Sequence, residues 1–92
     1  MDDFVQLIQQ AQSKDAHARR DAFDALMPQF QKMAFYVAYN RLQDVHVAED
    51  VVQEAFLTAY LKLDQLRDPQ AFAGWLKQIV LSHCDRYIRP DD

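Results

Sequence analysis

The amino-acid sequence predicts an all-α domain, and three observations support this prediction. The chain has 92 residues with one glycine and three prolines, so it has few places to turn. Half of the residues are apolar, which is enough for one compact core in a chain of this length. Apolar residues recur every three or four positions, and no segment shows the sustained alternation that is typical of strands. We therefore expect residues 1–92 to form a single bundle of three to four helices.

The N-terminal part of the chain predicts a short helix followed by a longer one. Phe4, Leu7, Ile8 and Ala11 recur at helical spacing and give the first helix one apolar face. Residues 13–15 form a polar break. Its last residue, an aspartate, can cap a second helix that begins near residue 16.

Pro28 lies inside the apolar stripe of this second helix. The stripe continues on both sides of it, through Phe23, Leu26, Met27, Phe30, Met33, Ala34, Val37 and Ala38. Proline removes one backbone donor and crowds the preceding turn, so we expect a kink or a short interruption. A second interpretation is that one helix ends near Met27 and another starts at Pro28, because proline is well tolerated at the first helical position.

A third helix is expected over residues 45–65, after a polar break that ends at Asp44, its candidate cap. Its apolar residues fall on one stripe that must be buried: Val51, Val52, Ala55, Phe56, Ala59 and Leu63. Elsewhere on this helix lie three carboxylates and an amide, with no lysine or arginine among them: Glu49, Asp50, Gln53 and Glu54. Such a patch suits a basic partner. The ordinary alternative is a solvated surface, since charged helix faces are common.

The last helix is expected over residues 69–89. Asp68 can cap it, Pro69 suits its first position, and Pro90 ends it. Its apolar series is Phe72, Trp75, Leu76, Ile79, Val80 and Cys84, with Tyr87 and Ile88 near the end. Gly74 either weakens this helix or admits a close neighbour.

The charge and cysteine content narrow the class of protein. A net charge of −4 argues against a protein that coats nucleic acid through a strongly basic surface, so any DNA contact must be local. A single cysteine, Cys84, cannot form an internal disulfide, and no apolar run is long enough to cross a membrane. We expect a soluble cytoplasmic protein, not inserted in a membrane, in which Cys84 is a small buried residue.

Catalytic and metal-binding patterns are incomplete in this sequence. His46, Glu49, Asp50 and Glu54 have spacings that metal ligands could use, but bundle sites with bridging carboxylates also need Glu-x-x-His pairs, which do not occur. The sequence contains no glycine-rich phosphate loop, serine nucleophile motif or cysteine-histidine pattern. We expect no enzyme activity, no catalytic residue, no cofactor and no metal.

Residues 48–57, Ala-Glu-Asp-Val-Val-Gln-Glu-Ala-Phe-Leu, closely resemble the second conserved region of bacterial RNA polymerase sigma factors, particularly the extracytoplasmic-function (ECF) group of the sigma-70 family. The resemblance continues through residues 63–79 and is looser over residues 21–30. In total it covers about residues 20 to 89. It implies a compact helical bundle equivalent to region 2 of these factors.

This resemblance also implies partners and site residues. The third helix would bind the clamp coiled coil of the RNA polymerase core through Glu49, Asp50, Gln53 and Glu54. The segment from Leu66 onward would open the promoter and capture bases of the non-template strand of the minus-ten element. The polar and basic residues available there are Arg67, Gln70, Lys77, Gln78, His83, Arg86, Tyr87 and Arg89. For Phe72 and Trp75 core packing is favoured over base stacking, whereas for Tyr87 neither is favoured.

The expected function is therefore binding in transcription initiation. The main alternative is a sigma-like adaptor or regulator that docks on polymerase or on an anti-sigma factor without reading a promoter. It is favoured because Asp85, Asp91 and Asp92 dilute the basic charge near the last helix. Sigma factors of this group also carry a second helical domain, region 4, which is absent from this chain. The chain is accordingly expected to be a fragment or a naturally short protein.

Overall fold

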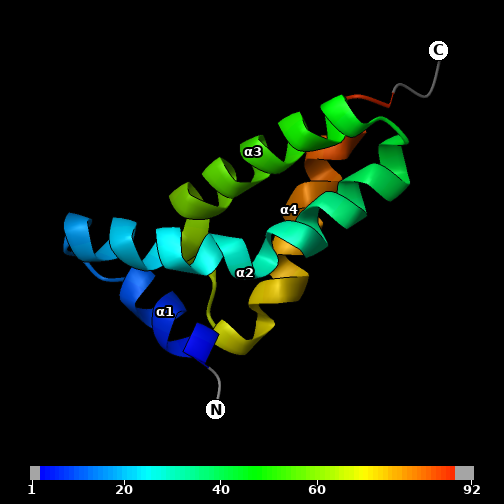
Figure 1. Ribbon diagram of the computed structural model, residues 1–92. Helices are drawn as coiled ribbons and strands as arrows, with labels where there is room; N and C mark the ends of the chain where they lie inside the picture. Colours follow the sequence, from blue (N-terminus) through cyan, green and yellow to red (C-terminus); the bar gives the residue numbers. More distant parts are fainter. Residues whose placement is uncertain (1–2, 89–92) are drawn as a thin grey trace.

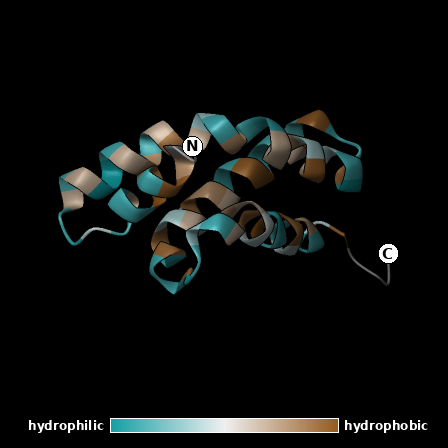
Figure 2. Ribbon diagram, turned by 90° about the horizontal axis from the view of Figure 1, so that it is seen from below, coloured by the Kyte–Doolittle hydropathy of each residue, from teal (hydrophilic) through white to brown (hydrophobic). Residues whose placement is uncertain are grey.

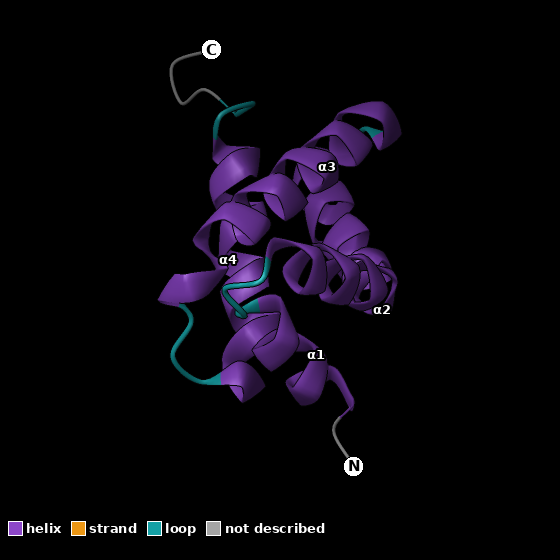
Figure 3. Ribbon diagram, turned by 90° about the vertical axis from the view of Figure 1, so that its left-hand side faces the viewer, coloured by secondary structure: helices purple, strands orange, loops and turns teal. Residues whose placement is uncertain are grey.

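The computed structural model describes residues 3–88, and these fold into α-helices joined by short loops (Figure 3). The helices are α1 (Asp3–Ala11), α2 (Ala16–Leu42), α3 (Val45–Lys62) and α4 (Phe72–Asp85). Two short 3-10 helices, η1 (Leu63–Gln65) and η2 (Pro69–Ala71), connect α3 to α4. Since residues 3–88 contain no strand, the prediction of an all-α bundle is confirmed.

The long helix α2 is the centre of the bundle, because it packs against α1, α3 and α4. A two-residue connection turns the chain from α2 into α3, and the two helices run antiparallel (Figure 1). Helix α4 packs against both of them and runs from the end of the molecule that holds α1 toward the α2–α3 connection. Residues on one side of every helix are therefore enclosed by the other helices.

The core draws on all four helices. Hydrophobic and hydrophilic residues alternate along each ribbon, as expected for helices with one buried face (Figure 2). The largest fully buried side chains are Phe72, Ile8, Leu26, Leu63, Leu76, Val51, Val80 and Cys84. Phe72 meets Phe30 edge to face, with ring centroids 4.9 Å apart. Because Phe72 is only 1% exposed, its ring is not available to a base, and Trp75 packs against the same core while partly buried.

Helix α2 continues without a break through Pro28. The interpretation in which one helix ends near Met27 and another begins at Pro28 is therefore wrong. The axis of α2 changes direction near its middle, as the expected kink requires (Figure 1). The helix persists because its buried residues lie on both sides of the proline, and their packing offsets one lost backbone hydrogen bond: Ala22, Phe23, Leu26, Ala34 and Ala38.

The three predicted helix caps are confirmed. The Asp15, Asp44 and Asp68 carboxylates each accept a hydrogen bond of 3.0 Å from a backbone N–H two or three residues further on. The third helix was expected over residues 45–65. The α-helix ends at Lys62, and the last three of the expected residues form the 3-10 helix η1.

The last helix is shorter than predicted. The turn after Asp68 is the 3-10 helix η2, so the α-helix starts at Phe72 and ends at Asp85. Residues 86 and 87 form a turn whose N–H groups donate to the last carbonyls of α4, which terminates the helix. Residues 89 and 90 lie outside the described part of the chain. Apart from its chain neighbours and the backbone of its own helix, Gly74 has no atom of residues 3–88 within 4 Å of the place where a Cβ would stand, so the interpretation that it admits a close neighbour is wrong.

One side chain that the sequence analysis did not single out, Gln12, connects the end of α1 to the segment between α3 and α4. The Gln12 Nε2 donates to the carbonyl oxygens of Leu63, at 3.0 Å, and Leu66, at 2.9 Å. Gln12 lies just after α1, whereas both carbonyls belong to the segment that leaves α3. This amide therefore fixes the position of the loop that leads to α4.

Candidate functional site

Helix α3 separates its residues into two chemically different sides. Its buried stripe consists of Ala48, Val51, Val52, Ala55, Phe56 and Ala59. The four side chains predicted to bind a partner are all exposed, and we call them the acidic face: Glu49, Asp50, Gln53 and Glu54. Burial of the stripe holds the helix in one rotation about its axis, so the acidic face points to solvent without further support.

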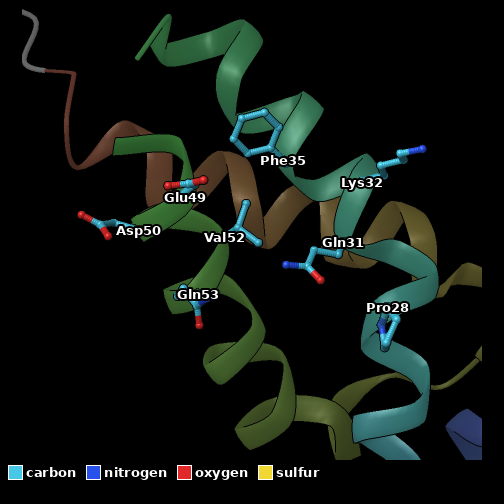
Figure 4. A pocket seen from close by; sticks show the side chains of 8 residues that line it. All are labelled: Pro28, Gln31, Lys32, Phe35, Glu49, Asp50, Val52 and Gln53. Carbon is cyan, nitrogen blue, oxygen red and sulfur yellow. The ribbon is translucent and has the colours of Figure 1, made fainter. Parts of the chain in front are cut away.

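The acidic face is not neutralised by lysine or arginine from the described part of the chain. Over residues 3–88 the lysine and arginine ion pairs are Arg20–Asp24 and Arg41–Asp85, and neither includes a residue of the face. Lys32 lies on the facing helix, but its ammonium group is directed away from α3 (Figure 4). The negative charge of Glu49 and Asp50 is therefore available to another molecule.

A groove of about 810 Å³ runs between α2 and α3 beside this face. Glu49, Asp50 and Gln53 line it on the α3 side, and α2 contributes the opposite wall (Figure 4). Its lining also includes the hydrophobic Phe35 and Val52. A partner side chain with an apolar stem and a cationic head can place its stem in such a groove and its head against a carboxylate.

Glu54 differs from the rest of the acidic face because side chains near the end of α4 engage it. The Tyr87 hydroxyl donates a hydrogen bond of 3.1 Å to Glu54 Oε2. The other carboxylate oxygen, Glu54 Oε1, lies 3.4 Å from His83 Nδ1. The hydrogen bond to Glu54, more than any other cause, raises the pKa of the Tyr87 phenol, since the negative carboxylate disfavours a phenolate beside it.

The position of His83 does not suit a DNA contact. The sequence analysis named His83 among the polar and basic residues available to DNA, but the side chain is buried, with 7% exposure. Its Nε2 lies 2.8 Å from Thr58 Oγ1, so the ring bridges α4 to α3. The sequence carries only a weak signal that His83 is buried, because His83 directly precedes the buried Cys84 and so lies at the border of the apolar stripe.

The other described candidates for DNA binding are exposed: Arg67, Gln70, Lys77, Gln78, Arg86 and Tyr87. They form two groups. The first four lie in the loop before α4 and in the first half of α4. Arg86 and Tyr87 come directly after α4, whose last residue lies about 12 Å beyond Lys77 along the helix axis. Arg89 lies outside the described residues, so no position is assigned to it.

The remaining candidates for chemistry are few. Burial, the largest cause, raises the pKa of the Cys84 thiol, which fits the predicted role of a small buried residue. Residues 3–88 hold no group of three or more histidine, cysteine, aspartate or glutamate side chains arranged to bind a metal. No helix over the same residues is long and apolar enough to cross a membrane.

Comparison with known proteins identifies the family. Residues 26–92, most of the chain, match the family model Sigma-70 region 2. This chain belongs to the sigma-70 family as a region 2 domain. Its relatives are ECF sigma factors or other RNA polymerase sigma factors, which confirms the resemblance seen over residues 48–57.

Three of these relatives show how much of a sigma factor the region 2 domain represents. The chain is 37% identical to the ECF RNA polymerase sigma-E factor of Escherichia coli K12, over 89% of the chain and 40% of the relative. It is 32% identical to the RNA polymerase sigma-H factor of Pseudomonas aeruginosa, over 95% and 46%. It is 35% identical to the ECF RNA polymerase sigma factor SigW of Bacillus subtilis, over 66% and 33%. The chain thus spans less than half the length of these relatives. No solved structure matches it significantly.

Proposed function

We propose that this region 2 domain docks on the RNA polymerase core through the acidic face and captures single-stranded promoter DNA through the loop after η1 and the first half of α4. The observation that carries the proposal is the exposure of Glu49, Asp50 and Gln53, without a lysine or arginine partner from residues 3–88, on a helix that lies inside the match to the family model. The names of the relatives place them in transcription as polymerase sigma factors. The domain acts by binding and not by covalent chemistry.

Docking on the core uses charge-assisted contacts on one rigid helix. Arginine or lysine side chains on the clamp coiled coil bind the carboxylates of Glu49 and Asp50, and partial removal of water strengthens these pairs relative to exposed ones. The Gln53 amide adds a neutral donor and acceptor in the same row. The groove beside them accepts the apolar stem of a basic side chain against Phe35 and Val52.

Capture of DNA uses two exposed cations, Arg67 and Lys77, which make no ion pair in residues 3–88. Asp64 and Asp68 are exposed carboxylates of the same segment, and Asp68 also caps η2, so attraction for phosphate is confined to the two cationic side chains. The exposed amides of Gln70 and Gln78 can hydrogen-bond the edges of unstacked bases. With Phe72 buried, hydrogen bonds and phosphate attraction contribute more than stacking on that ring.

The docking half of the proposal is tested by reversing one charge. Asp50→Arg should weaken binding to the polymerase core by about 1–3 kcal/mol, since it removes one charge-assisted interfacial contact and adds a like charge. Asp21→Arg is the matched control, because Asp21 is an exposed carboxylate on α2 with no side-chain partner among residues 3–88. Circular dichroism should show unchanged helicity in both variants. Equal core affinity of Asp50→Arg and the unaltered domain would contradict the docking surface.

The DNA half is tested by fluorescence anisotropy with single-stranded oligonucleotides. With core present, the domain should bind minus-ten sequences selected from a random pool more tightly than scrambled versions. Binding without discrimination would instead support the adaptor that docks on polymerase but reads no promoter. That second candidate is favoured by the burial of His83 and the engagement of Tyr87, which leave fewer polar groups for DNA at the end of α4.

A further inference from the structure

The loop between η1 and η2 is held by a residue that lies far away in the sequence. Gln12 Nε2 donates to the carbonyl oxygens of Leu63 and Leu66, across 51 and 54 positions of the chain. Helix α1 and the segment that leads into α4 lie side by side, and α1 contacts η2 (Figure 1). Gln12 precedes residues 26–92, which match the family model. The loop is therefore supported from outside the segment that the match covers.

The Gln12 amide replaces a backbone donor that the loop lacks. In a turn, a carbonyl oxygen often accepts the N–H of the residue three positions further on. Three positions after Leu66 is Pro69, which has no N–H. The N–H of the following residue, Gln70, donates instead to the Asp68 carboxylate at 3.0 Å. Neither position therefore supplies a donor to the Leu66 carbonyl, and Gln12 supplies one from the end of α1.

Gln12 is itself held in place by α1. Its backbone N–H donates to the Ile8 carbonyl oxygen at 3.0 Å, and its side chain is partly buried. The end of α1 is fixed in the core by Ile8, at 0% exposure, and Ala11, at 1%. The donor thus stands on a packed helix, so it can hold the Leu66 carbonyl in one orientation.

The Leu66 carbonyl belongs to the planar peptide unit that ends with the Arg67 N–H, so its orientation sets the direction in which the chain enters Arg67. The residue on the other side, Asp68, is also fixed, because its carbonyl oxygen accepts the Ala71 N–H at 2.9 Å and its carboxylate caps η2. Arg67 therefore lies between two fixed residues while its own side chain is exposed. Gln70, also exposed, follows in the capped turn.

We propose that Gln12 is a positioning residue for promoter reading, which holds Arg67 and Gln70 where they discriminate between DNA sequences. This inference rests on the proposed function, in which the two residues contact single-stranded DNA. Hydrogen bonds to base edges require a narrow geometry, whereas phosphate attraction tolerates movement of the loop. Loss of the Gln12 donor therefore lowers discrimination between sequences more than it lowers affinity for DNA in general. Docking on the core is unaffected, because Gln12 makes no hydrogen bond to the acidic face.

The experiment compares two oligonucleotides by fluorescence anisotropy in the presence of polymerase core. One is a single-stranded minus-ten sequence selected from a random pool on the unaltered domain–core complex, and the other is a scrambled version of it. The ratio of the two affinities measures discrimination. Gln12→Met keeps the length of the side chain and removes the donor. It should reduce this ratio about two- to tenfold, because the freed loop must be ordered again on the matched DNA. Its affinity for core should change by less than about twofold.

Two control variants separate positioning from stability. Gln10→Met makes the same chemical change on α1 at an exposed glutamine whose side chain makes no hydrogen bond in the described residues. Ile8→Val weakens the packing of α1 but leaves the donor on Gln12. Both should keep the discrimination ratio of the unaltered domain, at a temperature where circular dichroism shows every variant to be folded. If Gln12→Met does not fold, Gln12→Asn serves in its place, because its amide is one methylene too short to reach both carbonyls.

The results that overturn the inference differ from those that overturn the proposed function. If the unaltered domain discriminates and the Gln12 variant discriminates equally well, Gln12 does not position the loop for reading, and the proposed function stands. An equal loss of discrimination in Ile8→Val would likewise refute the inference, since the effect would be one of stability. If the unaltered domain itself does not discriminate, promoter reading fails and the role of Gln12 in it fails as well.

Discussion

Replacing Gln12 by alanine tests whether the amide that follows α1 holds the α3–α4 connection in place. This side chain makes two hydrogen bonds, to the carbonyl oxygens of Leu63 at 3.0 Å and Leu66 at 2.9 Å. Two such bonds would contribute about 1–3 kcal/mol together if both carbonyls were left without a partner. The structure narrows this range, because Leu63 also accepts the Leu66 N–H at 3.0 Å and so keeps one bond. Most of the loss falls on the Leu66 carbonyl, and we expect a destabilisation of about 1–2 kcal/mol.

The assay is unfolding in urea, followed by circular dichroism. If the dependence of the unfolding free energy on urea concentration is the same in each variant, a change in the transition midpoint reports a change in stability. Gln10→Ala is the matched control, because Gln10 is an exposed glutamine of α1 whose side chain makes no hydrogen bond in the described residues. It should change stability by less than about 0.5 kcal/mol. Hydrogen exchange should also speed up at the backbone amides of residues 66–68, 70 and 71 in Gln12→Ala, since the loop loses its anchor. A Gln12→Ala domain as stable as the Gln10→Ala control would refute the reasoning.

Three further predictions concern α4 and its contacts. Trp75→Ala should destabilise the fold by about 2–4 kcal/mol in the same unfolding assay, because the partly buried indole packs against the core. A fully stable variant that no longer binds the oligonucleotide would instead assign Trp75 to the DNA surface. Gly74→Ala should stabilise the domain by about 0.5–1 kcal/mol, since the φ of Gly74 is not positive and a Cβ there meets no atom of another segment within 4 Å. A loss of stability would contradict this prediction. Glu54→Gln should lower the pKa of Tyr87 toward the ordinary value for tyrosine, because the hydrogen-bonded carboxylate is what raises that pKa. The pH dependence of the NMR signals of the Tyr87 ring measures the change. An unchanged titration of Tyr87 would show that Glu54 is not the cause.

The features predicted correctly from the sequence are those fixed by neighbours in the chain. The aspartates at positions 15, 44 and 68 cap the turns that follow them, because an N-cap needs only a carboxylate and an N–H two or three residues away. The exposure of the acidic face follows from the apolar stripe of α3 in the same way. A stripe repeating every three or four residues orients the helix, whichever helices cover it.

The path of α2 through Pro28 could not be decided locally. A proline inside a helix costs one backbone hydrogen bond, and a proline at a helix start costs none, so the sequence allowed both interpretations. The continuous helix forms because the segments on both sides of the proline pack against α1, α3 and α4, and this packing keeps both segments helical across the bend. The true end of α4 at Asp85 was also missed, since the apolar series runs on through Tyr87 and Ile88.

The sequence by itself determined that this chain is helical, that α3 carries a carboxylate-rich exposed face, and that the domain belongs with sigma region 2. Tertiary structure alone decided which side chains meet: Gln12 with the carbonyls of Leu63 and Leu66, His83 with Thr58, and Tyr87 with Glu54. The physical reason is distance along the chain. Periodicity and capping act within a few residues, whereas these contacts join positions 25 to 54 residues apart and depend on where the helices cross.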